Sequence, residues 1–426
     1  MTNDMRATCP FCGLLCDDLT VRTQPDAVTV TRGGCAISVA AFARQADAAM
    51  VRPRVGGEAA TLDEAAAKAA ALLRAARQPL ICGLATDVGG MRAVMTLADR
   101  CGAVLDHMNS VAKFRNLLVL QDSGWITTTL AEVKNRADLV ILVGTDVVSR
   151  FPRFFERFVW NRETLFGHDP QQRQIIYLGQ GLDTSAGMSP AGQAPDLVAC
   201  EVARLGEGFG LMRALLAGRR LQATEAAGVP AATWQALLER IRVARYTVFA
   251  WAAPDLDFSH AELTVRNLCE LIKELNRSTR VAGLPLGGSN GDFTADAVEL
   301  WQTGFPFRTG FGSGGPVYDP YQWSGVRLLS SGEADVMLWI SSFDADLPPP
   351  RVNVPTIVLG RGGMEMKREP DVFIPVGTPG IDHMGHLLRA DKVVALRLPK
   401  LRDIGLPSVA RVVAAIDGHM SMGSPC

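Results

Sequence analysis

The sequence predicts an α/β fold with mostly parallel sheets, preceded by a small cysteine-bearing segment. Three observations support this prediction. Short apolar runs typical of buried strands alternate with helical patterns, four cysteines lie within the first 35 residues, and a different middle section interrupts the alternation. A chain of 426 residues is too long for one ordinary hydrophobic core, so we expect about two to four domains.

The cysteine-bearing segment comes first in the chain. Its cysteines follow the spacing C-x2-C-x3-C-x18-C and are Cys9, Cys12, Cys16 and Cys35. Between the third and fourth cysteines, apolar and polar side chains alternate on both sides of a Pro-Asp pair. This alternation predicts a β-hairpin, which would return the chain and bring the fourth thiol back to the other three.

An alternating strand and helix pattern follows the cysteines. Thr61 and Glu64 form a capping box ahead of an alanine-rich helical run. Short apolar runs at 80–85, 103–106 and 139–146 predict buried strands, and helical patterns separate them. Strands that alternate with helices indicate βαβ units, and therefore a mostly parallel sheet.

The middle section interrupts this pattern. It begins with a Phe- and Arg-rich stretch and ends with a long Gly-rich loop region, and the strand pattern resumes near residue 325. We interpret the middle section as a second domain inserted into the first α/β domain. The predicted organisation is a four-cysteine domain (1–55), a split α/β domain (56–148 and 325–400), an inserted α/β domain (149–324) and a C-terminal tail (401–426).

The composition excludes several classes of function. Hydrophobic residues make up 48% and charged residues 20% of a chain whose formal net charge is -1. Because no run of Lys or Arg is present, no nucleic-acid partner is expected. No apolar run reaches the roughly 18 residues of a membrane span, and no secretory leader is recognisable, so we expect no membrane association. Five further cysteines are scattered singly, which suits the reducing cytoplasm better than a disulfide framework.

Three other motifs are weak signals. The Gly-rich turns ATDVGG and GFGSGG lack a dinucleotide or P-loop pattern. His383 and His386 lie three residues apart, but an intervening glycine favours a turn with ordinary histidines over a metal clamp. GGSNG places Ser289 as a hydrolase nucleophile would be placed, yet Gly283 and Pro285 interrupt the strand that such an elbow requires. We interpret this last motif as a Gly-rich turn.

The four clustered cysteines are the strong motif. Thiolates are soft ligands, and four of them complete a tetrahedral shell around zinc or hold the corners of a [4Fe–4S] cluster. The spacing predicts a metal site at these four residues, and both metals remain open.

Four stretches of the chain resemble the B subunit of formylmethanofuran dehydrogenase, a member of the molybdopterin oxidoreductase superfamily. They are CPFCGLLCDDL, SVAKFRNLLVLQDSGWITTTLAEVKNRADLVILVGTD, LWQTGFPFRTGF and VFIPVGTPGIDHMGHLLRADKVVALRLPKL. The resemblance covers nearly the whole chain. It implies two doubly wound, Rossmann-like α/β domains, one inserted in the other, behind a four-cysteine domain. The pterin-binding β-barrel that ends larger relatives is not expected here.

The resemblance also implies where a redox site would lie. Such proteins bind a pterin-held Mo or W through a Cys followed by His, and Ala112 and Lys113 stand at those two positions. An Arg and a nearby His are expected where Gly287 and Ser289 stand. A methyl group cannot ligate a metal, and without the Arg no fixed fork holds a small carboxylate. We therefore expect no Mo- or W-pterin, and no catalytic or cofactor-binding residue, in this chain.

With these positions degenerate, the pattern is most similar to the B subunit of the formyltransferase/hydrolase complex of methylotrophic bacteria. That resemblance implies a non-redox structural subunit in one-carbon metabolism. Its partners would handle formyl groups on a methanofuran-like carrier: an amidohydrolase-like A subunit, a β-helical C subunit and a formyltransferase D subunit.

Two points remain open at this stage. The Phe/Arg-rich stretch 151–160 is either a docking surface, because aromatic and Arg residues are enriched at interfaces, or part of the core of the inserted domain. Two other functions also stay open: an active Mo- or W-pterin formylmethanofuran dehydrogenase with an unusual ligand set, and an Fe–S electron-transfer protein.

Overall fold

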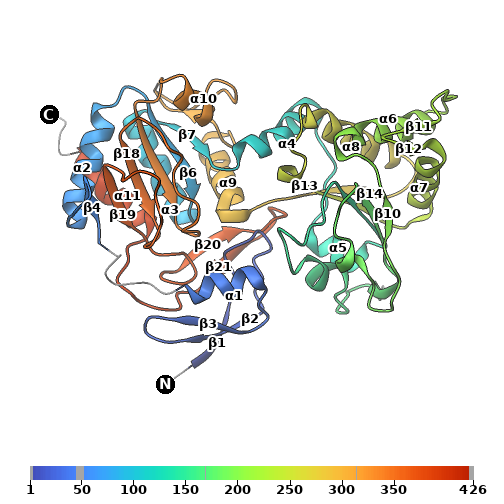
Figure 1. The fold of residues 1–426 in the computed structure, drawn as a ribbon, viewed down its shortest axis with the longest axis horizontal. Helices are drawn as coiled ribbons and strands as arrows, with labels where there is room; N and C mark the ends of the chain where they lie inside the picture. The colour runs from blue at the N-terminus through green and yellow to red at the C-terminus, as the bar shows by residue number, and fades with distance from the viewer. Residues whose placement is uncertain (1–2, 45–51, 168, 313, 422–426) are drawn as a thin grey trace. The chain divides into compact units, whose positions relative to one another are not determined.

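The structure, a computed structural model, describes residues 3–44, 52–167, 169–312 and 314–421. The chain forms two compact units, and each is described separately (Figure 1). Unit 1 holds residues 1–110 and 288–426, and unit 2 holds residues 111–287. The expectation of a mixed α/β fold is confirmed, because strands alternate with helices along the chain and form several sheets. The last residues of the predicted tail, 422–426, lie outside the described residues.

A nine-stranded sheet forms the centre of unit 1. In spatial order its strands are β16 (Val317–Tyr318), β15 (Thr309–Gly310), β7 (Val104–His107), β6 (Pro79–Ala85), β17 (Val336–Ser341), β18 (Thr356–Gly360), β19 (Val372–Pro375), β4 (Arg54–Val55) and β5 (Glu58–Ala59). The five strands from β7 to β19 are parallel, and the short strands at both edges are antiparallel. The parallel strands are buried on both faces, which explains why they are continuous apolar runs in the sequence.

Helices cover both faces of this sheet. They are α2 (Leu62–Ala75), α3 (Val88–Cys101), α9 (Asp292–Thr303), α10 (Gly325–Ser330) and α11 (Val409–Ser421). Along β17, Leu338 and Ile340 join a core with α2, α3, α9 and α11, whereas Met337 and Trp339 join a second core with α10. The predicted capping box of α2 is confirmed, since the Glu64 amide donates to the Thr61 hydroxyl at 3.2 Å and the Thr61 amide donates to the Glu64 carboxylate at 2.8 Å.

Two small antiparallel sheets complete unit 1. The first consists of β1 (Asn3–Ala7), β2 (Leu19–Thr23) and β3 (Val28–Arg32), and helix α1 (Ala36–Ala43) follows it. The antiparallel pairing of β2 with β3 confirms the hairpin that the sequence predicts. The second sheet pairs β20 (Gly385–Leu388) with β21 (Ala395–Leu398).

Unit 2 contains a five-stranded sheet in which every strand is parallel to its neighbours. In spatial order the strands are β10 (Asp196–Val198), β9 (Gln174–Leu178), β8 (Leu139–Val143), β13 (Thr247–Ala252) and β14 (Val281–Leu286). The helices are α4 (Ser110–Ser123), whose first residue belongs to unit 1, α5 (Leu130–Arg136), α6 (Leu205–Leu216), α7 (Ala231–Val243) and α8 (Ala261–Leu275). A hairpin of β11 (Glu225–Ala226) and β12 (Val229–Pro230) precedes α7. In the described part of the chain, no helix is long and apolar enough to cross a membrane.

The borders of the units differ from the predicted domain borders. Strand β8, which we expected in the first α/β domain, pairs with β9 and β13 in unit 2. Helix α9 and strand β15, which we expected in the inserted domain, belong to unit 1, where β15 pairs with β7. Residues 1–55 fall within unit 1. Long-range strand pairing decides these borders, and local sequence patterns do not report it.

The Phe-rich stretch of unit 2 lies in its interior. Four phenylalanines are each at most 7% exposed: Phe151, Phe154, Phe155 and Phe158. Phe154 and Phe155 pack edge to face with ring centroids 5.7 Å apart, next to the π-helical turn η2 (Phe155–Val159). Of the two interpretations left open for 151–160, the four phenylalanines therefore fit core residues and not a docking surface. Aromatic residues are common in cores and interfaces alike, so their density alone could not distinguish the two.

Candidate functional site

The four predicted metal ligands lie around the N-terminal sheet of unit 1. Three of them, Cys9, Cys12 and Cys16, occupy the loop between β1 and β2 and are 4%, 7% and 6% exposed. The Cys9 amide donates to the Cys16 carbonyl at 2.9 Å, which closes this loop into a tight turn. Cys35 follows β3, is half-buried, and occupies the position just before α1. The β2–β3 hairpin therefore returns the chain as expected.

The thiols influence one another electrostatically. Burial raises the pKa of the Cys9 thiol well above its ordinary value, and the neighbouring Cys12, Cys16 and Cys35 raise this pKa further. The donor types suit zinc or iron, because four thiolates are a complete ligand set for either. However, the described residues contain no group of three or more His, Cys, Asp or Glu side chains arranged to hold a metal ion. The metal site therefore stays a prediction, supported by residue type and proximity and not by a preformed ligand shell.

The degenerate family positions fall in both units. Ala112 and Lys113 lie in the first turn of α4, where Ala112 is half-buried and Lys113 is 9% exposed. Gly287 directly follows β14 and is half-buried. These three residues belong to unit 2, whereas Ser289 belongs to unit 1. None of the four supplies a sulfur ligand.

The geometry around Ser289 tests the nucleophile-elbow motif. The prediction that Gly283 and Pro285 break the preceding strand is wrong, because both lie within β14. Strand β14 is at the edge of its sheet, where a proline is tolerated. The Ser289 hydroxyl accepts a hydrogen bond from the Asn109 amide nitrogen at 3.4 Å. Strand, turn and helix thus follow one another as in an elbow, but the group that contacts this serine is an amide and not a general base.

A buried ionic network in unit 1 was not predicted from the sequence. Asp106 and His107 end strand β7, and Asp296 and Glu299 lie on helix α9. The four side chains belong to residues that are at most 4% exposed. One helix face carries three acidic residues of α9, namely its first residue Asp292, Asp296 and Glu299. This spacing is the sequence signal that could have indicated the network.

One half of the network surrounds His107. The His107 Nδ1 accepts a hydrogen bond from the Asn109 backbone amide at 3.1 Å, and the His107 Nε2 lies 2.9 Å from Asp296 Oδ1. The Lys392 ammonium lies 3.6 Å from the other oxygen of Asp296. The Asn109 side chain, two residues after β7, also donates to Asp292 at 2.8 Å, so this part of the chain contacts the acidic helix face at Asp292 and at Asp296.

The other half pairs Asp106 with Arg308. The Arg308 Nε lies 3.5 Å from Asp106 Oδ1, and the Gly325 amide donates to Asp106 Oδ2 at 2.8 Å. Arg308 also donates to the Pro320 carbonyl at 2.6 Å and to the Ser110 hydroxyl at 3.3 Å. Burial raises the pKa of Asp106, and Arg308 opposes that rise.

Glu299 is a further buried carboxyl of this network. Burial raises its pKa well above the ordinary value, the nearby Thr309 hydroxyl opposes the rise, and the charges of Asp296 and Asp106 add to it. Since the residue is 1% exposed, no substrate reaches this carboxyl. The network holds α9 against β7 and β15, and we assign it a structural role.

The chain is similar to known proteins over most of its length. No protein-family model matches the chain. The chain is 29% identical over 408 residues to the B subunit of a tungsten-containing formylmethanofuran dehydrogenase from Methanocaldococcus jannaschii, covering 93% of each protein. It is 31% identical over 337 residues to the B subunit of the formyltransferase/hydrolase complex Fhc from Methylorubrum extorquens, covering 76% of this chain and 85% of that protein.

A solved structure is similar over almost its whole length. It is one chain of the crystal structure of the formyltransferase/hydrolase complex of Methylorubrum extorquens with methylofuran. The TM-score is 0.71 at 29% sequence identity, and the match covers 87% of this chain and 99% of that chain. The similarity therefore extends over both compact units.

Proposed function

Because the chain belongs to the family of B subunits of formyltransferase/hydrolase complexes, we propose that it is the structural B subunit of such a complex in one-carbon metabolism. The observation that carries this proposal is the match to a chain of the solved complex, which covers 99% of that chain. Formyl transfer and hydrolysis to formate on a methanofuran-like carrier belong to the partner subunits in this proposal. The complex works in the cytoplasm.

We further propose the identity of the partners and of the domains. The partners are an amidohydrolase-like A subunit, a β-helical C subunit and a formyltransferase D subunit. The nine-stranded and five-stranded sheets belong to two doubly wound domains, one inserted in the other, and the four-cysteine segment is a third, small domain. The strand order of each sheet supports this proposal. In both sheets the first parallel strand in the sequence, β6 or β8, lies inside the sheet, and later parallel strands lie on both sides of it.

The alternative is an active Mo- or W-pterin dehydrogenase, which the name of the relative from Methanocaldococcus jannaschii favours. Ala112 and Lys113 argue against it, because neither a methyl group nor an ammonium group is a ligand for these metals. Gly287 likewise carries no guanidinium to hold a small carboxylate.

Purification of the assembled complex tests the proposal. The chain should co-purify stoichiometrically with A, C and D subunits when the four are co-expressed. The complex should release formate from the formylated carrier without an electron acceptor and should contain no Mo, W or pterin. Stoichiometric pterin, or formate release that depends on an electron acceptor, would instead establish the dehydrogenase.

We also propose that the four cysteines bind one metal centre that shapes the N-terminal segment and takes no part in turnover. Cys12→Ser should then lower the iron or zinc content of anaerobically purified complex and increase proteolysis within residues 3–44, while formate release stays unchanged. Cys82→Ser, which changes a buried cysteine elsewhere in unit 1, is the matched control and should leave the metal content unaltered. If Cys12→Ser abolishes turnover in a fully assembled complex, the centre is catalytic and the proposal is wrong.

A further inference from the structure

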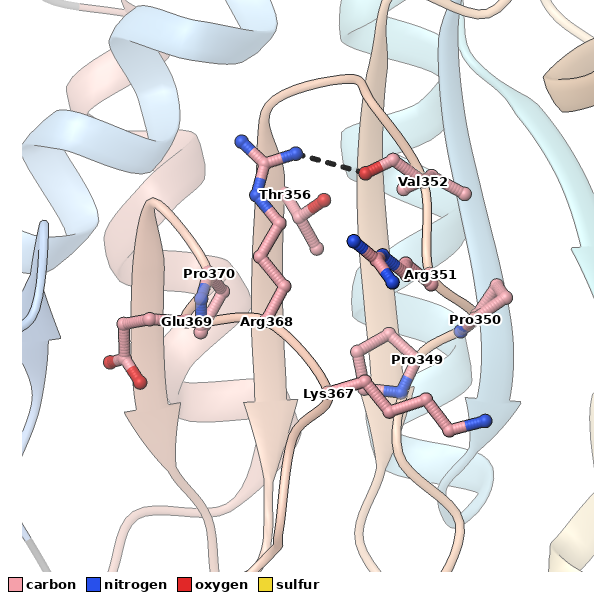
Figure 2. A pocket seen from close by; sticks show the side chains of 9 residues that line it. All are labelled: Pro349, Pro350, Arg351, Val352, Thr356, Lys367, Arg368, Glu369 and Pro370. Carbon is pink, nitrogen blue, oxygen red and sulfur yellow. Dashed lines mark hydrogen bonds between the residues drawn. The ribbon is translucent and has the colours of Figure 1, made fainter.

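A basic pocket in unit 1 has no role in the function proposed above. It is lined by two loop segments, 349–352 and 367–370, and by Thr356 (Figure 2). Thr356 is the first residue of β18, and the second loop segment directly precedes β19. The pocket therefore lies at the amino ends of these parallel strands. Ligands of open α/β sheets bind at the opposite, carboxyl ends, so this pocket is a separate surface feature.

Positive charge dominates the pocket. Its lining contains Arg351, Lys367 and Arg368, which are all exposed, and the single acidic residue Glu369. The Glu369 carboxylate is already occupied, because the Arg54 Nε lies 2.8 Å from it. This excess of positive charge is local, since the whole chain has a formal net charge of -1.

The basic side chains are available to a partner. Arg368 donates to the Val352 carbonyl at 2.9 Å, which joins the two loop segments and leaves its positive charge uncompensated (Figure 2). Within the described residues, neither Arg351 nor Lys367 has a hydrogen bond or an ion pair. The nearby Asp371 carboxylate accepts a hydrogen bond from the Thr356 backbone amide at 2.9 Å, so this carboxylate binds the backbone and not the basic side chains.

The arrangement of these groups defines the ligand. The charged ends of Arg368, Arg351 and Lys367 follow one another in a row and do not converge on one point (Figure 2). A single phosphate requires converging donors, whereas a row suits successive carboxylates of an extended chain. Pro349, Pro350 and Pro370 stiffen the backbone of the walls, so little conformational entropy is lost on binding.

We propose that this basic pocket docks an extended acidic segment of a partner subunit. That the partner is a subunit of the complex rests on the function proposed above. That the docked segment is acidic rests on the charges of the pocket alone. Association through exposed charges is fast and sensitive to salt, so the contact contributes mainly to the rate and specificity of assembly.

The double variant Arg351→Glu/Lys367→Glu tests the proposal on the whole chain. A synthetic peptide of alternating glutamate and glycine should bind the unmodified chain at low salt, and the double variant should bind it at least about tenfold more weakly. Arg92→Glu/Arg411→Glu, which makes the same change of charge on the exposed faces of α3 and α11, should bind the peptide as the unmodified chain does. Equal peptide binding by all three proteins, or no binding at all, would overturn the proposal. Inorganic phosphate that displaces the peptide at equal concentration would overturn it too, by indicating a small-anion site.

Assembly of the co-expressed complex is the second measurement. The pocket variant should join its partner subunits more slowly than the control variant, and the difference should vanish at high salt. If both variants assemble at the same rate, the pocket is not a docking site, although the proposed function stands. If even the unmodified chain joins no partner subunit, the proposed function fails, and the peptide measurement still decides whether the pocket binds acidic chains.

Discussion

Glu299 shows what a single buried carboxyl means for this protein. It lies on α9 near Asp296 and Asp106, and burial together with these two charges raises its pKa. The raised pKa means that the folded state favours the protonated carboxyl. Below the ordinary pKa of 4.5 both folded and unfolded chains are protonated, so the full stability is present there. As the pH rises from that value through the folded pKa, the unfolded chain releases its proton first and stability is lost.

We predict that Glu299→Gln removes this loss, because the amide imitates the neutral acid. The free energy of unfolding of the unmodified chain, relative to that of the variant, should fall by at most about 1.4 kcal/mol per pH unit above the ordinary carboxyl pKa. Urea unfolding of both proteins from mildly acidic to mildly alkaline pH measures the difference. Glu58→Gln, at an exposed site on the edge strand β5, should change nothing. An identical pH profile for all three proteins would show that Glu299 is ionised in the folded state.

At the scale of elements, helix α6 shows how one missing side chain lets two elements pack. Gly208 on α6 faces Trp234 of α7, and a Cβ at Gly208 would overlap the indole ring. Trp234 is fully buried, and its Nε1 donates to the Ala226 carbonyl at 3.0 Å, so the ring has no room to move. Two residues further along the same helix, Gly210 has no atom within 4 Å of the position that a Cβ would take.

The two glycines therefore predict opposite results for the same substitution. Gly208→Ala should lower the free energy of unfolding by about 1–3 kcal/mol, because the core is already fully packed there. Gly210→Ala should raise it by up to about 1 kcal/mol, because alanine is the better helix former and meets no neighbour. Chemical denaturation of each variant measures both changes. Equal effects of the two substitutions would mean that the contact with Trp234 does not limit the packing of α6.

At the scale of the whole molecule, the sequence of unit 2 is inserted between the two stretches that form unit 1. Unit 2 is a single continuous stretch, residues 111–287, and its buried core consists of residues within that stretch. Unit 1 is assembled from two stretches, because β6 and β7 pair with strands that follow unit 2 in the sequence. A continuous stretch with its own core meets the physical requirements of an independently folding domain.

We predict that residues 111–287, expressed alone, fold and unfold in one cooperative transition. Circular dichroism during urea denaturation measures this, and Gly208→Ala should shift the transition of the fragment and of the whole chain by the same free energy. Residues 149–324, the inserted domain expected from the sequence, are the control. That fragment lacks strand β8 at the centre of the sheet and should not fold cooperatively. A fragment 111–287 without a cooperative transition would show that unit 2 depends on unit 1.

Local patterns determined much of this protein in advance. Alternating and continuous apolar runs predicted the β2–β3 hairpin and the buried strands, and the Thr61–Glu64 pair predicted the start of α2. The prediction of no redox chemistry has a different basis, because the family resemblance places Ala112 at the metal-ligand position and a methyl group cannot bind a metal. These properties depend on side chains close in sequence or on one residue's own chemistry.

Only the tertiary structure decided the rest. The borders of the units depend on which strands pair, and β8 pairs with strands far away in sequence. The ionic network around His107 and Glu299 and the basic pocket each bring together residues from separate segments, and the burial of Phe151 to Phe158 appears only in the folded chain. The burial of these side chains and the charges next to them are set only when distant parts of the chain pack together. No short stretch of sequence contains that information.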